Sequence, residues 1–348
     1  MATTETLPEL TVSNDVRNDI EELRRRLNED GYLFFRRLLD PDSLLKMRRE
    51  MLTIMQAGGW LVAGTDPIDG IADPETRCTE GDLGYTDVYH EVYKLQSFHE
   101  IAHGPEIMSV LEDVRGCPMM PQPQKVARLW FPKFTAHTTP IHQDFVHFQG
   151  TFDNLTCWSP VGDCPIELGG LAVLPGSHKV ARVLDHHFSL GAGSLLVEPS
   201  EYPEIDSEWH STNYEVGDTL IFPALTVHKA LPNVTEDRLR VSLDNRYQRV
   251  GDPIAEHMLN PHLSSMSPLS WDEVYAGWNG GSTQYYWKQF DTPVLPKITE
   301  FLDKGFDEAV DLAKTGNEHA KLHLSRIAIR DPESDQGSRA AAVLATLN

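Results

Sequence analysis

Basic residues are scarce in this chain. Its 348 residues include 30 Lys and Arg against 52 Asp and Glu, and the formal net charge is -22 at pH 7. Binding to phosphate-rich surfaces needs surplus positive charge, so the balance argues against nucleic acid and anionic membranes as partners. It leaves room for a local basic pocket that binds one small carboxylate. The length allows one large domain or two small ones.

Cysteine is also sparse. The four cysteines are Cys78, Cys117, Cys157 and Cys164, and none of them forms a C-x-x-C pair. The spacing therefore suggests neither a zinc ribbon nor a thioredoxin motif. Four cysteines are too few for a disulfide scaffold in a chain of this size, so we expect reduced thiols in a cytoplasmic protein.

Long hydrophobic runs are missing as well. No apolar run approaches the roughly 20 residues that a membrane span needs. The first residues, "MATTETLPELTVSNDVRND", have neither a basic flank nor an apolar stretch, so we do not expect a signal peptide there. Hydrophobic residues still make up 40% of the chain, which is ordinary for a protein with a real core.

The first third of the chain is mainly helical in pattern. Residues 15–30 have apolar side chains near helical spacing, and a turn and a short strand follow. Asp40 then fits a helix cap, with Pro41 at the first helical position. Residues 57–84 are rich in Gly, Asp, Pro and Thr, which predicts a long loop and a candidate lid.

From about residue 124 the pattern changes to short β-branched and aromatic runs between turns. Many short strands at this spacing indicate a β-sandwich or barrel. We predict a mainly β fold with flanking helices, as one domain over residues 1–348. Its β core covers about residues 120–250, with a helical N-terminal region and a helical C-terminal extension. The aromatic segment 271–290 is a second lid candidate, although it could equally form a contact surface in a homodimer.

The stretch "TPIHQDFVHFQGT", residues 139–151, places His142 and Asp144 two residues apart. In a strand these side chains share one face with Phe148, while His147 points the other way. A carboxylate that faces a β core is costly unless it is paired or bound to a metal. Pairing of His142 with Asp144, or a strand end in water, would explain the motif equally well.

A third candidate ligand is His228, in "GDTLIFPALTVHKALPN". It follows a predicted strand, 86 residues after His142. Two histidines and one carboxylate bind one face of a non-haem iron and leave the other positions open. Taken alone, His228 could also be a surface residue.

Arg240 and Ser242, in "DRLRVSLDNRYQ", also share one face of a predicted strand. An inward-facing Arg in an apolar strand requires a buried anion. Arg can bind a carboxylate through two parallel hydrogen bonds, and a neighbouring hydroxyl can add a third. The alternatives are a salt bridge between Arg240 and Asp244, or Arg238 in place of Arg240.

Taken together, these motifs resemble the phytanoyl-CoA dioxygenase family of iron(II)- and 2-oxoglutarate-dependent oxygenases. The match runs in order from about residue 27 to 248. It comprises "LNEDGYLFFRRLLDPDSLLKMRRE", His142-Gln143-Asp144, "CWSPVGD" with Trp158, "GGLAVLPGSHK" at 169–179, the His228 segment, Arg240 and Ser242.

The resemblance implies a double-stranded β-helix, that is, a cupin-like jelly roll. It implies that His142, Asp144 and His228 bind iron(II), that Arg240 and Ser242 bind the far carboxylate of 2-oxoglutarate, and that O2 takes the last position. Gln124 lies about where relatives place an amide against the other end of the co-substrate; a solvent-facing Gln is the alternative reading.

The resemblance also implies oxidation of a C–H bond, with 2-oxoglutarate converted to succinate and CO2. Because halogenating relatives lack the metal-binding acid, Asp144 favours hydroxylation, while desaturation, epimerisation and ring closure use the same oxidant. Phe148 and Trp158 are candidates for the wall of a pocket for an apolar or ring-containing small molecule of secondary metabolism; the alternative is that both are core residues.

Two other classes of function compete with the oxygenase reading. One is a zinc-dependent isomerase or hydrolase on a cupin-like barrel, with the same three metal ligands. The other is a binding or sensor protein that has kept the fold without the activity. The Arg240–Ser242 pair argues for the oxygenase, because a zinc hydrolase needs no site for 2-oxoglutarate.

Overall fold

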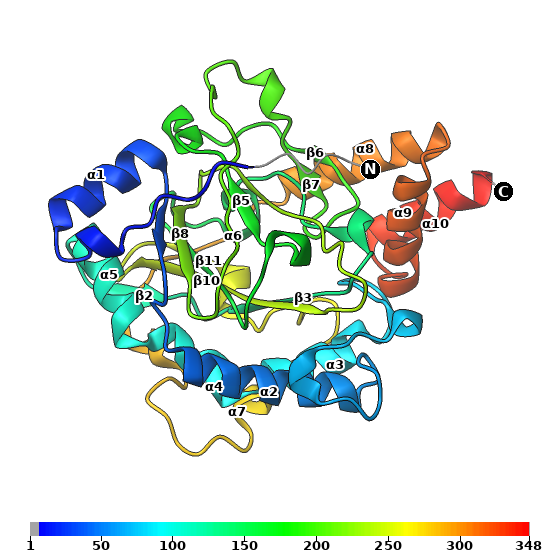
Figure 1. Ribbon diagram of the computed structural model, residues 1–348. Coiled ribbons are helices and arrows are strands. Elements are labelled where there is room, and N and C mark those ends of the chain that lie inside the picture. The colour runs from blue at the N-terminus through cyan, green and yellow to red at the C-terminus, as the bar shows by residue number, and fades with distance from the viewer. Residues whose placement is uncertain (1–6, 348) are drawn as a thin grey trace.

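The computed structural model describes residues 7–347, and a six-stranded antiparallel sheet lies at its centre (Figure 1). The strand order is β1-β8-β4-β10-β2, and β3 pairs with a further part of β10. The strands are β1 (Leu33–Phe35), β2 (Met119–Pro121), β3 (Val126–Trp130), β4 (Leu155–Pro160), β8 (Thr219–Pro223) and β10 (Arg240–Arg249).

Three small two-stranded sheets complete the β structure of the described residues. They are β5 (Leu171–Val173) with β9 (His228–Ala230), β6 (His187–Phe188) with β7 (Leu195–Leu196), and β11 (Ile254–Ala255) with β12 (Val294–Leu295). An isolated bridge between His142 and His228 joins the segment before Asp144 to β9. The β11–β12 pair is parallel and the other sheets are antiparallel, and helices flank them, so the predicted β structure with flanking helices is confirmed.

Helices cover the main sheet from one side. The N-terminal helices are α1 (Ile20–Asp30), α2 (Pro41–Ala57), α3 (Tyr85–Tyr93), α4 (Gln96–Glu100) and α5 (Pro105–Arg115), and α7 (Trp271–Tyr275) joins them from later in the chain. Helices α2, α3 and α4 run along the lower side of Figure 1. Met47 and Met51 of α2 belong to the same buried cluster as Leu243 of β10. Burying such a side chain stabilises a fold by about 1.5–3 kcal/mol.

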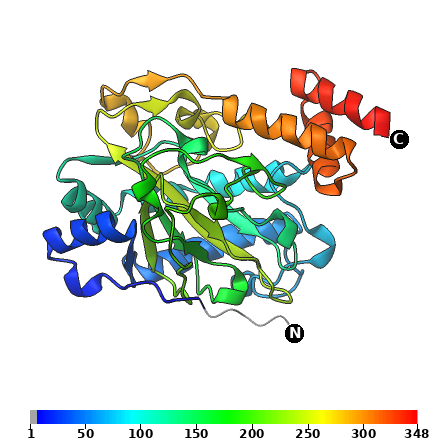
Figure 2. The same ribbon diagram turned by 90° about the horizontal axis from the view of Figure 1, so that it is seen from above.

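Three more helices end the described chain: α8 (Glu300–Lys314), α9 (Glu318–Arg330) and α10 (Asp335–Leu347). They lie beside the sheets, orange to red in Figures 1 and 2. Phe306, Ala309, Leu324 and Ala340 give them a core of their own, which includes Phe188 of β6. A helical C-terminal extension was predicted, and it is present.

The helix cap at Asp40 is confirmed, because its carboxylate accepts a hydrogen bond from the backbone of Ser43. The helix predicted for residues 15–30 begins later, at Ile20. Asp19 caps it by accepting from the backbone of Glu22, and the preceding residues 14–16 form a 3-10 turn. A capping carboxylate fixes the first turn more strongly than apolar spacing does.

The strand predicted over the His142 motif is wrong. Only His142 makes a β-bridge, and Phe145–Phe148 form a single helical turn, α6. The backbone of Phe148 donates to the carbonyl of Asp144, and that of Phe145 donates to the carbonyl of Ala224. Four apolar residues suit a strand or a helical turn equally well, so periodicity could not decide between them.

Residues 57–84 are a long connection, as predicted, with two short 3-10 helices at Pro67–Asp69 and Pro74–Thr76.

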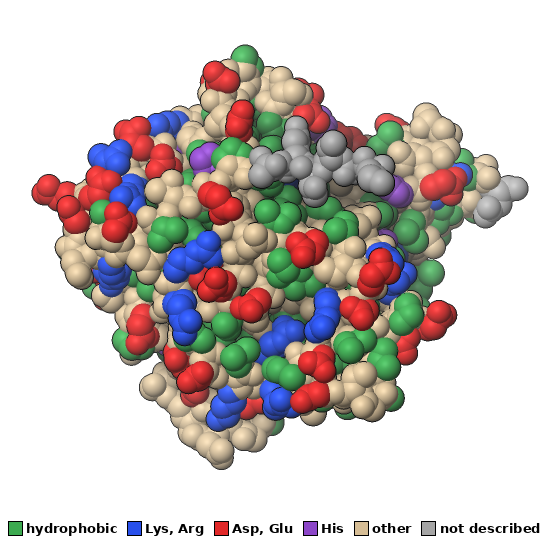
Figure 3. Space-filling view, viewed as in Figure 1, with side chains coloured by type: hydrophobic (Ala, Val, Ile, Leu, Met, Phe, Trp, Pro, Cys, Tyr) green, Lys and Arg blue, Asp and Glu red, His purple; other side chains and the backbone are tan. Residues whose placement is uncertain are grey.

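Within the part of the chain that is described, no helix has both the length and the apolar character for crossing a bilayer. On the face seen in Figure 3, Lys and Arg side chains are interspersed with Asp and Glu.

Candidate metal centre

Three side chains that are far apart in the sequence meet in one buried place. Their potential ligand atoms, from His142, Asp144 and His228, all lie within 4.8 Å of one another. Oδ1 of Asp144 is 3.4 Å from Nε2 of His142 and 3.7 Å from Nε2 of His228. The backbones of the two histidines exchange hydrogen bonds, at 2.9 and 3.1 Å. The bridge between the strands therefore sets the spacing of the two imidazoles.

Each imidazole is oriented by its own backbone. Nδ1 of His142 donates to the carbonyl of Pro140 at 2.8 Å, and Nδ1 of His228 donates to that of Thr226 at 3.0 Å. With the proton on Nδ1, Nε2 carries a free lone pair that can bind a metal. Burial lowers the pKa of His228 to about 3, so this imidazole is neutral at physiological pH.

Asp144 supplies the negative charge. Burial alone would raise the pKa of this carboxyl group, but Arg246 and the two histidines outweigh burial and hold the pKa well below its ordinary value. The carboxylate is therefore ionised in the unliganded protein. Two imidazole nitrogens and one anionic oxygen on one side fit a divalent cation such as iron(II), with positions left for further ligands.

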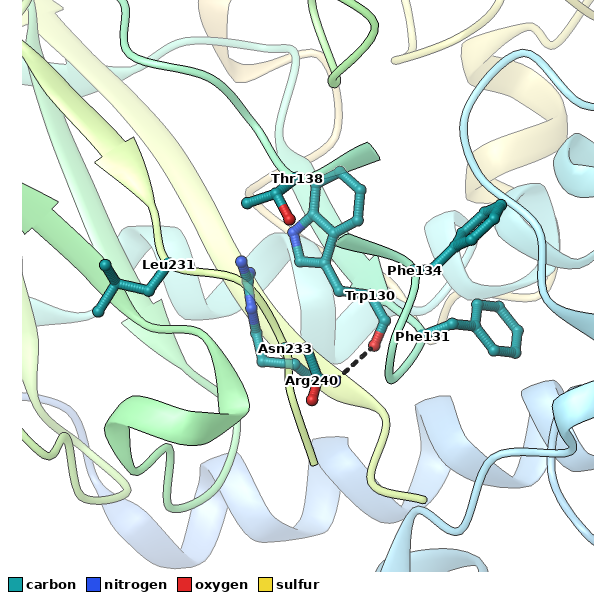
Figure 4. Close-up of a pocket in the computed structure, with 7 residues that line it drawn as sticks. All are labelled: Trp130, Phe131, Phe134, Thr138, Leu231, Asn233 and Arg240. Carbon is teal, nitrogen blue, oxygen red and sulfur yellow. Dashed lines mark hydrogen bonds between the residues drawn. The ribbon is translucent and has the colours of Figure 1, made fainter. Parts of the chain in front are cut away.

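Arg240 lies in the same interior as these ligands, and its side chain is only 2% exposed. Its Nη1 donates to Oγ of Ser242 at 2.5 Å, while its buried Nε has no hydrogen-bond partner. The guanidinium carbon lies 5.7 Å from the ring centroid of Trp130 and 5.8 Å from that of Trp158. Figure 4 shows the Arg240 side chain beside the Trp130 indole, on the neighbouring strand.

Arg240 has no directly paired acid among the described residues. Burial lowers the pKa of Arg240 to about 10, so it remains a cation at neutral pH. Across residues 7–347 no carboxylate forms an ion pair with it. The proposed pair with Asp244 is wrong, because Asp244 instead pairs with Arg246 at 3.0 Å and Arg128 at 3.6 Å. A buried, unpaired cation with a free donor is suited to an incoming anion.

Arg238, the rival for this role, lies outside the site. Its side chain is 53% exposed and donates to the backbone carbonyl of Asp69. Residue parity could not separate Arg238 from Arg240, because both would have faced the same way in one continuous strand. Strand β10 begins only at Arg240, so Arg238 lies before the regular alternation.

A cavity with about 320 Å³ of empty space, part of it open to solvent, connects His142 and His228 to Arg240. It is lined by Arg128, Trp130, Thr139, His142, Trp158, Leu171, His228, Ala230, Arg240 and Asp244. A second hollow of about 230 Å³ adjoins it and shares Trp130 and Arg240; its lining is drawn in Figure 4.

The other candidate residues have different surroundings. Trp158 lines the cavity, as predicted for a pocket residue. Phe148 instead packs in a cluster with Val126 and Ile254, with the guanidinium of Arg246 over its ring at 3.4 Å. The side chain of Phe148 does not share a face with His142 and Asp144 as predicted, because Phe148 lies on a helical turn. For the same reason His147 comes close to His142, with ring centroids 5.6 Å apart.

Gln124 is 8% exposed, so the solvent-facing alternative is wrong. Its amide nitrogen donates to the backbone carbonyls of His257 at 3.2 Å and Asn260 at 3.0 Å. It thus ties strand β3 to a loop more than 130 residues later. Gln124 is not among the residues that line the 320 Å³ cavity.

The two lid candidates both pack on the domain. From the 57–84 segment, Glu80 reaches Arg128 of the cavity lining at 2.5 Å, and the neighbouring Asp82 pairs with Arg326 of α9 at 2.6 Å. In the 271–290 segment, Trp271 and Trp287 belong to the main hydrophobic cluster. Much of its aromatic character is therefore used in packing against the N-terminal helices.

A two-histidine, one-carboxylate centre beside an unpaired buried Arg, in a fold of antiparallel sheets, is the arrangement of a non-haem oxygenase that uses an anionic co-substrate. Residues 27–241 match the family model of Phytanoyl-CoA dioxygenase (PhyH), and the chain belongs to this family. It is an iron(II)- and 2-oxoglutarate-dependent oxygenase.

Two curated relatives are both described as 1-deoxypentalenic acid 11-beta-hydroxylase. The protein from Streptomyces arenae is 27% identical over 277 residues, which is 77% of this chain and 94% of that protein. The protein from Streptomyces exfoliatus is 27% identical over 279 residues, with the same coverage of both chains.

Among solved structures, the non-heme alpha ketoglutarate dependent carbocyclase SnoK from nogalamycin biosynthesis is similar in fold. Its TM-score is 0.50 at 19% sequence identity, and the match covers 72% of this chain and 91% of that one. At this identity the likeness concerns the fold alone.

Proposed function

We propose that this oxygenase hydroxylates a C–H bond of a small apolar or ring-containing molecule, with decarboxylation of 2-oxoglutarate to succinate and CO2. The observation that carries the proposal is the buried, unpaired Arg240 in the same cavity as two of the three candidate metal ligands, His142 and His228. A metal site alone would suit several classes of enzyme, whereas a metal site with a separate cation for a carboxylate suits a 2-oxoglutarate enzyme.

The roles of the side chains follow from their positions. Nε2 of His142, Nε2 of His228 and an oxygen of Asp144 would hold iron(II). When bound, iron and 2-oxoglutarate supply the oxidising chemistry together with O2, and the protein positions them. Arg240 would bind the far carboxylate, with the hydroxyl of Ser242 as a second donor. Trp130 and Trp158 flank the guanidinium and shield this ion pair from water.

The arrangement of the sheets supports a jelly roll within a single domain. The main sheet supplies Arg240 and Ser242 from β10, whereas β9, in the smaller β5–β9 sheet, supplies His228. The cavity lies between these elements, since residues of β3, β4, β5, β9 and β10 all line it. Two facing sheets with the site between them would correspond to the double-stranded β-helix that the resemblance implied.

The substrate class rests on the walls and on the relatives. Trp130, Trp158 and Leu171 line the cavity with apolar surface. The curated relatives are described as hydroxylases of 1-deoxypentalenic acid, which supports hydroxylation of a small molecule in secondary metabolism. Asp144 fills the position that halogenation would need open, and desaturation, epimerisation or ring closure are the alternative outcomes at the same site.

Incubation with iron(II), 2-oxoglutarate, heavy-isotope O2 and 1-deoxypentalenic acid as the probe tests this proposal. We expect succinate in amounts that depend on O2, and one labelled oxygen atom in the oxidised probe. A probe of the wrong shape would still leave slow succinate formation, because the co-substrate site does not depend on it. The opposite result has two parts: 2-oxoglutarate is not converted with iron(II), and zinc supports a reaction of the probe that needs no O2. That result would favour the isomerase or hydrolase instead.

A further inference from the structure

The two oxygens of the Asp144 carboxylate have different surroundings. Oδ1 faces the imidazoles, 3.4 Å from Nε2 of His142 and 3.7 Å from Nε2 of His228. Oδ2 accepts a hydrogen bond from the hydroxyl of Thr156. Nη2 of Arg246 lies 3.1 Å from both oxygens. Arg246 thus contacts both oxygens, and the hydroxyl of Thr156 binds Oδ2 alone, which leaves Oδ1 as the oxygen turned toward the metal position.

We infer that Thr156 and Arg246 are positioning residues, which hold Asp144 so that it offers the metal Oδ1 alone. The inference rests on the proposed iron site and concerns how that site is kept open. A carboxylate can bind a cation through one oxygen or through both. If Asp144 used both, it would occupy a coordination position that the co-substrate or O2 requires.

The two positioning residues form a rigid pair. Thr156 of β4 and Arg246 of β10 are directly opposite each other in the main sheet, so their side chains project from the same face. Both are almost fully buried. Register between two central strands fixes side-chain positions more tightly than a loop does. The orientation of Asp144, which itself lies just before α6, is therefore set by the sheet.

Arg246 is held by further contacts. Its Nη2 also pairs with Oδ1 of Asp244 at 3.0 Å, and its Nη1 donates to the backbone carbonyl of Asp244 at 2.8 Å. Its guanidinium lies over the ring of Phe148 at 3.4 Å. With these contacts the guanidinium has little freedom to move. It therefore fixes the orientation of the Asp144 carboxylate.

The surrounding charges make this buried arginine tolerable. Asp244 lies near Arg128, at 3.6 Å, and Arg128 pairs with Glu80. Charges of opposite sign therefore alternate from Glu80 in the 57–84 segment to Asp144 at the metal position. A buried ion that has close partners of opposite sign avoids most of the penalty of leaving water. Simple charge balance could explain Arg246, but it does not explain the hydroxyl of Thr156.

Thr156→Val and Thr156→Ser separate the two explanations, because neither changes any charge. Val keeps the shape of Thr without the hydroxyl, and Ser keeps the hydroxyl. Metal-free protein is titrated with Co(II), and both the affinity and the visible absorption of the bound ion are recorded. We expect Val to weaken Co(II) binding about tenfold and to alter the absorption band, since mutating such supporting residues commonly costs 10–100-fold in affinity. Ser should stay within about threefold of the parent.

Arg246→Lys is the second variant, because it keeps the charge but loses the planar fork that joins Asp144, through Nη2, to the backbone of Asp244, through Nη1. We expect a loss of about 10–100-fold in Co(II) affinity. Arg48→Met is the matched control: Arg48 is a half-buried arginine that donates to the carbonyls of Ile68 and Val161, away from the site. The Arg48→Met variant should bind Co(II) with the affinity of the parent, even if its unfolding in urea changes.

The outcomes are distinct. If Thr156→Val and Arg246→Lys bind Co(II) with the affinity and spectrum of the parent, the positioning role is wrong, while loss of binding in Asp144→Ala still supports the metal site. If Asp144→Ala also binds like the parent, the metal site itself is misassigned. If Arg246→Lys does not fold, the Thr156 pair decides the question alone.

Discussion

Asp144→Ala is expected to bind iron(II) at least about 100-fold more weakly than the parent and to lose turnover. The substitution removes the one anionic ligand and leaves the two imidazoles. It also leaves Arg246 without one of its two carboxylates, so a buried cation would stand beside an incoming dication. Both effects act in the same direction. Anaerobic calorimetry of metal-free protein with iron(II) measures the affinity directly.

Asp144→Asn and Asp153→Ala are the controls for this prediction. Asn keeps the shape of the ligand without its charge, so it should lie between the parent and the Ala variant. Asp153 is a partly exposed carboxylate near Arg115 and Arg249, outside the site, and its removal should leave iron affinity unchanged. Iron binding in Asp144→Ala within a few-fold of the parent would be incompatible with the assignment.

The second large effect is expected at Arg240. Removing one partner of a buried, charge-assisted contact costs about 3 kcal/mol or more, which is about 100-fold or more in affinity. Arg240→Ala should therefore raise the 2-oxoglutarate concentration for half-maximal succinate formation by at least that factor. Iron affinity in the absence of 2-oxoglutarate should change little, because Arg240 does not contact the metal ligands.

Arg238→Ala is the matched control, two residues away on the same chain segment. Because its side chain is half exposed and contacts the backbone of Asp69, the 2-oxoglutarate requirement should change by less than about twofold. Arg240→Lys keeps the charge without the planar fork and should fall between the two. A larger effect in Arg238→Ala than in Arg240→Ala would move the co-substrate site.

The sequence was most informative where a strand is long and regular. On β10, alternate residues are polar in an otherwise apolar run, and Arg240 and Ser242 indeed lie together, joined by a hydrogen bond. Arg246 lies on the same face of β10 as Arg240 and Ser242. Extending the alternation by two residues beyond Asp244 would have predicted it as a site residue. Its partner, Asp144, could not have been inferred from β10 alone.

Local periodicity failed where tertiary contacts decide the backbone. The turn at α6 depends on the backbone contact between Phe145 and Ala224, nearly 80 residues away. Gln124 depends on a loop that returns at His257–Asn260. In both cases the partner is distant in the sequence, and no pattern within a short window identifies it. The three candidate metal ligands were nevertheless identified, because the order of their motifs along the chain does not depend on the backbone structure between them.

The most direct test of the central claim is the visible spectrum of the protein with iron(II) and 2-oxoglutarate under anaerobic conditions. Chelation of iron(II) by the keto acid end of 2-oxoglutarate gives a weak metal-to-ligand charge-transfer band. We predict this band for the parent, its absence from Asp144→Ala, and its recovery in Arg240→Ala only at much higher 2-oxoglutarate. No band in the parent, or an equal band in Asp144→Ala, would contradict the account.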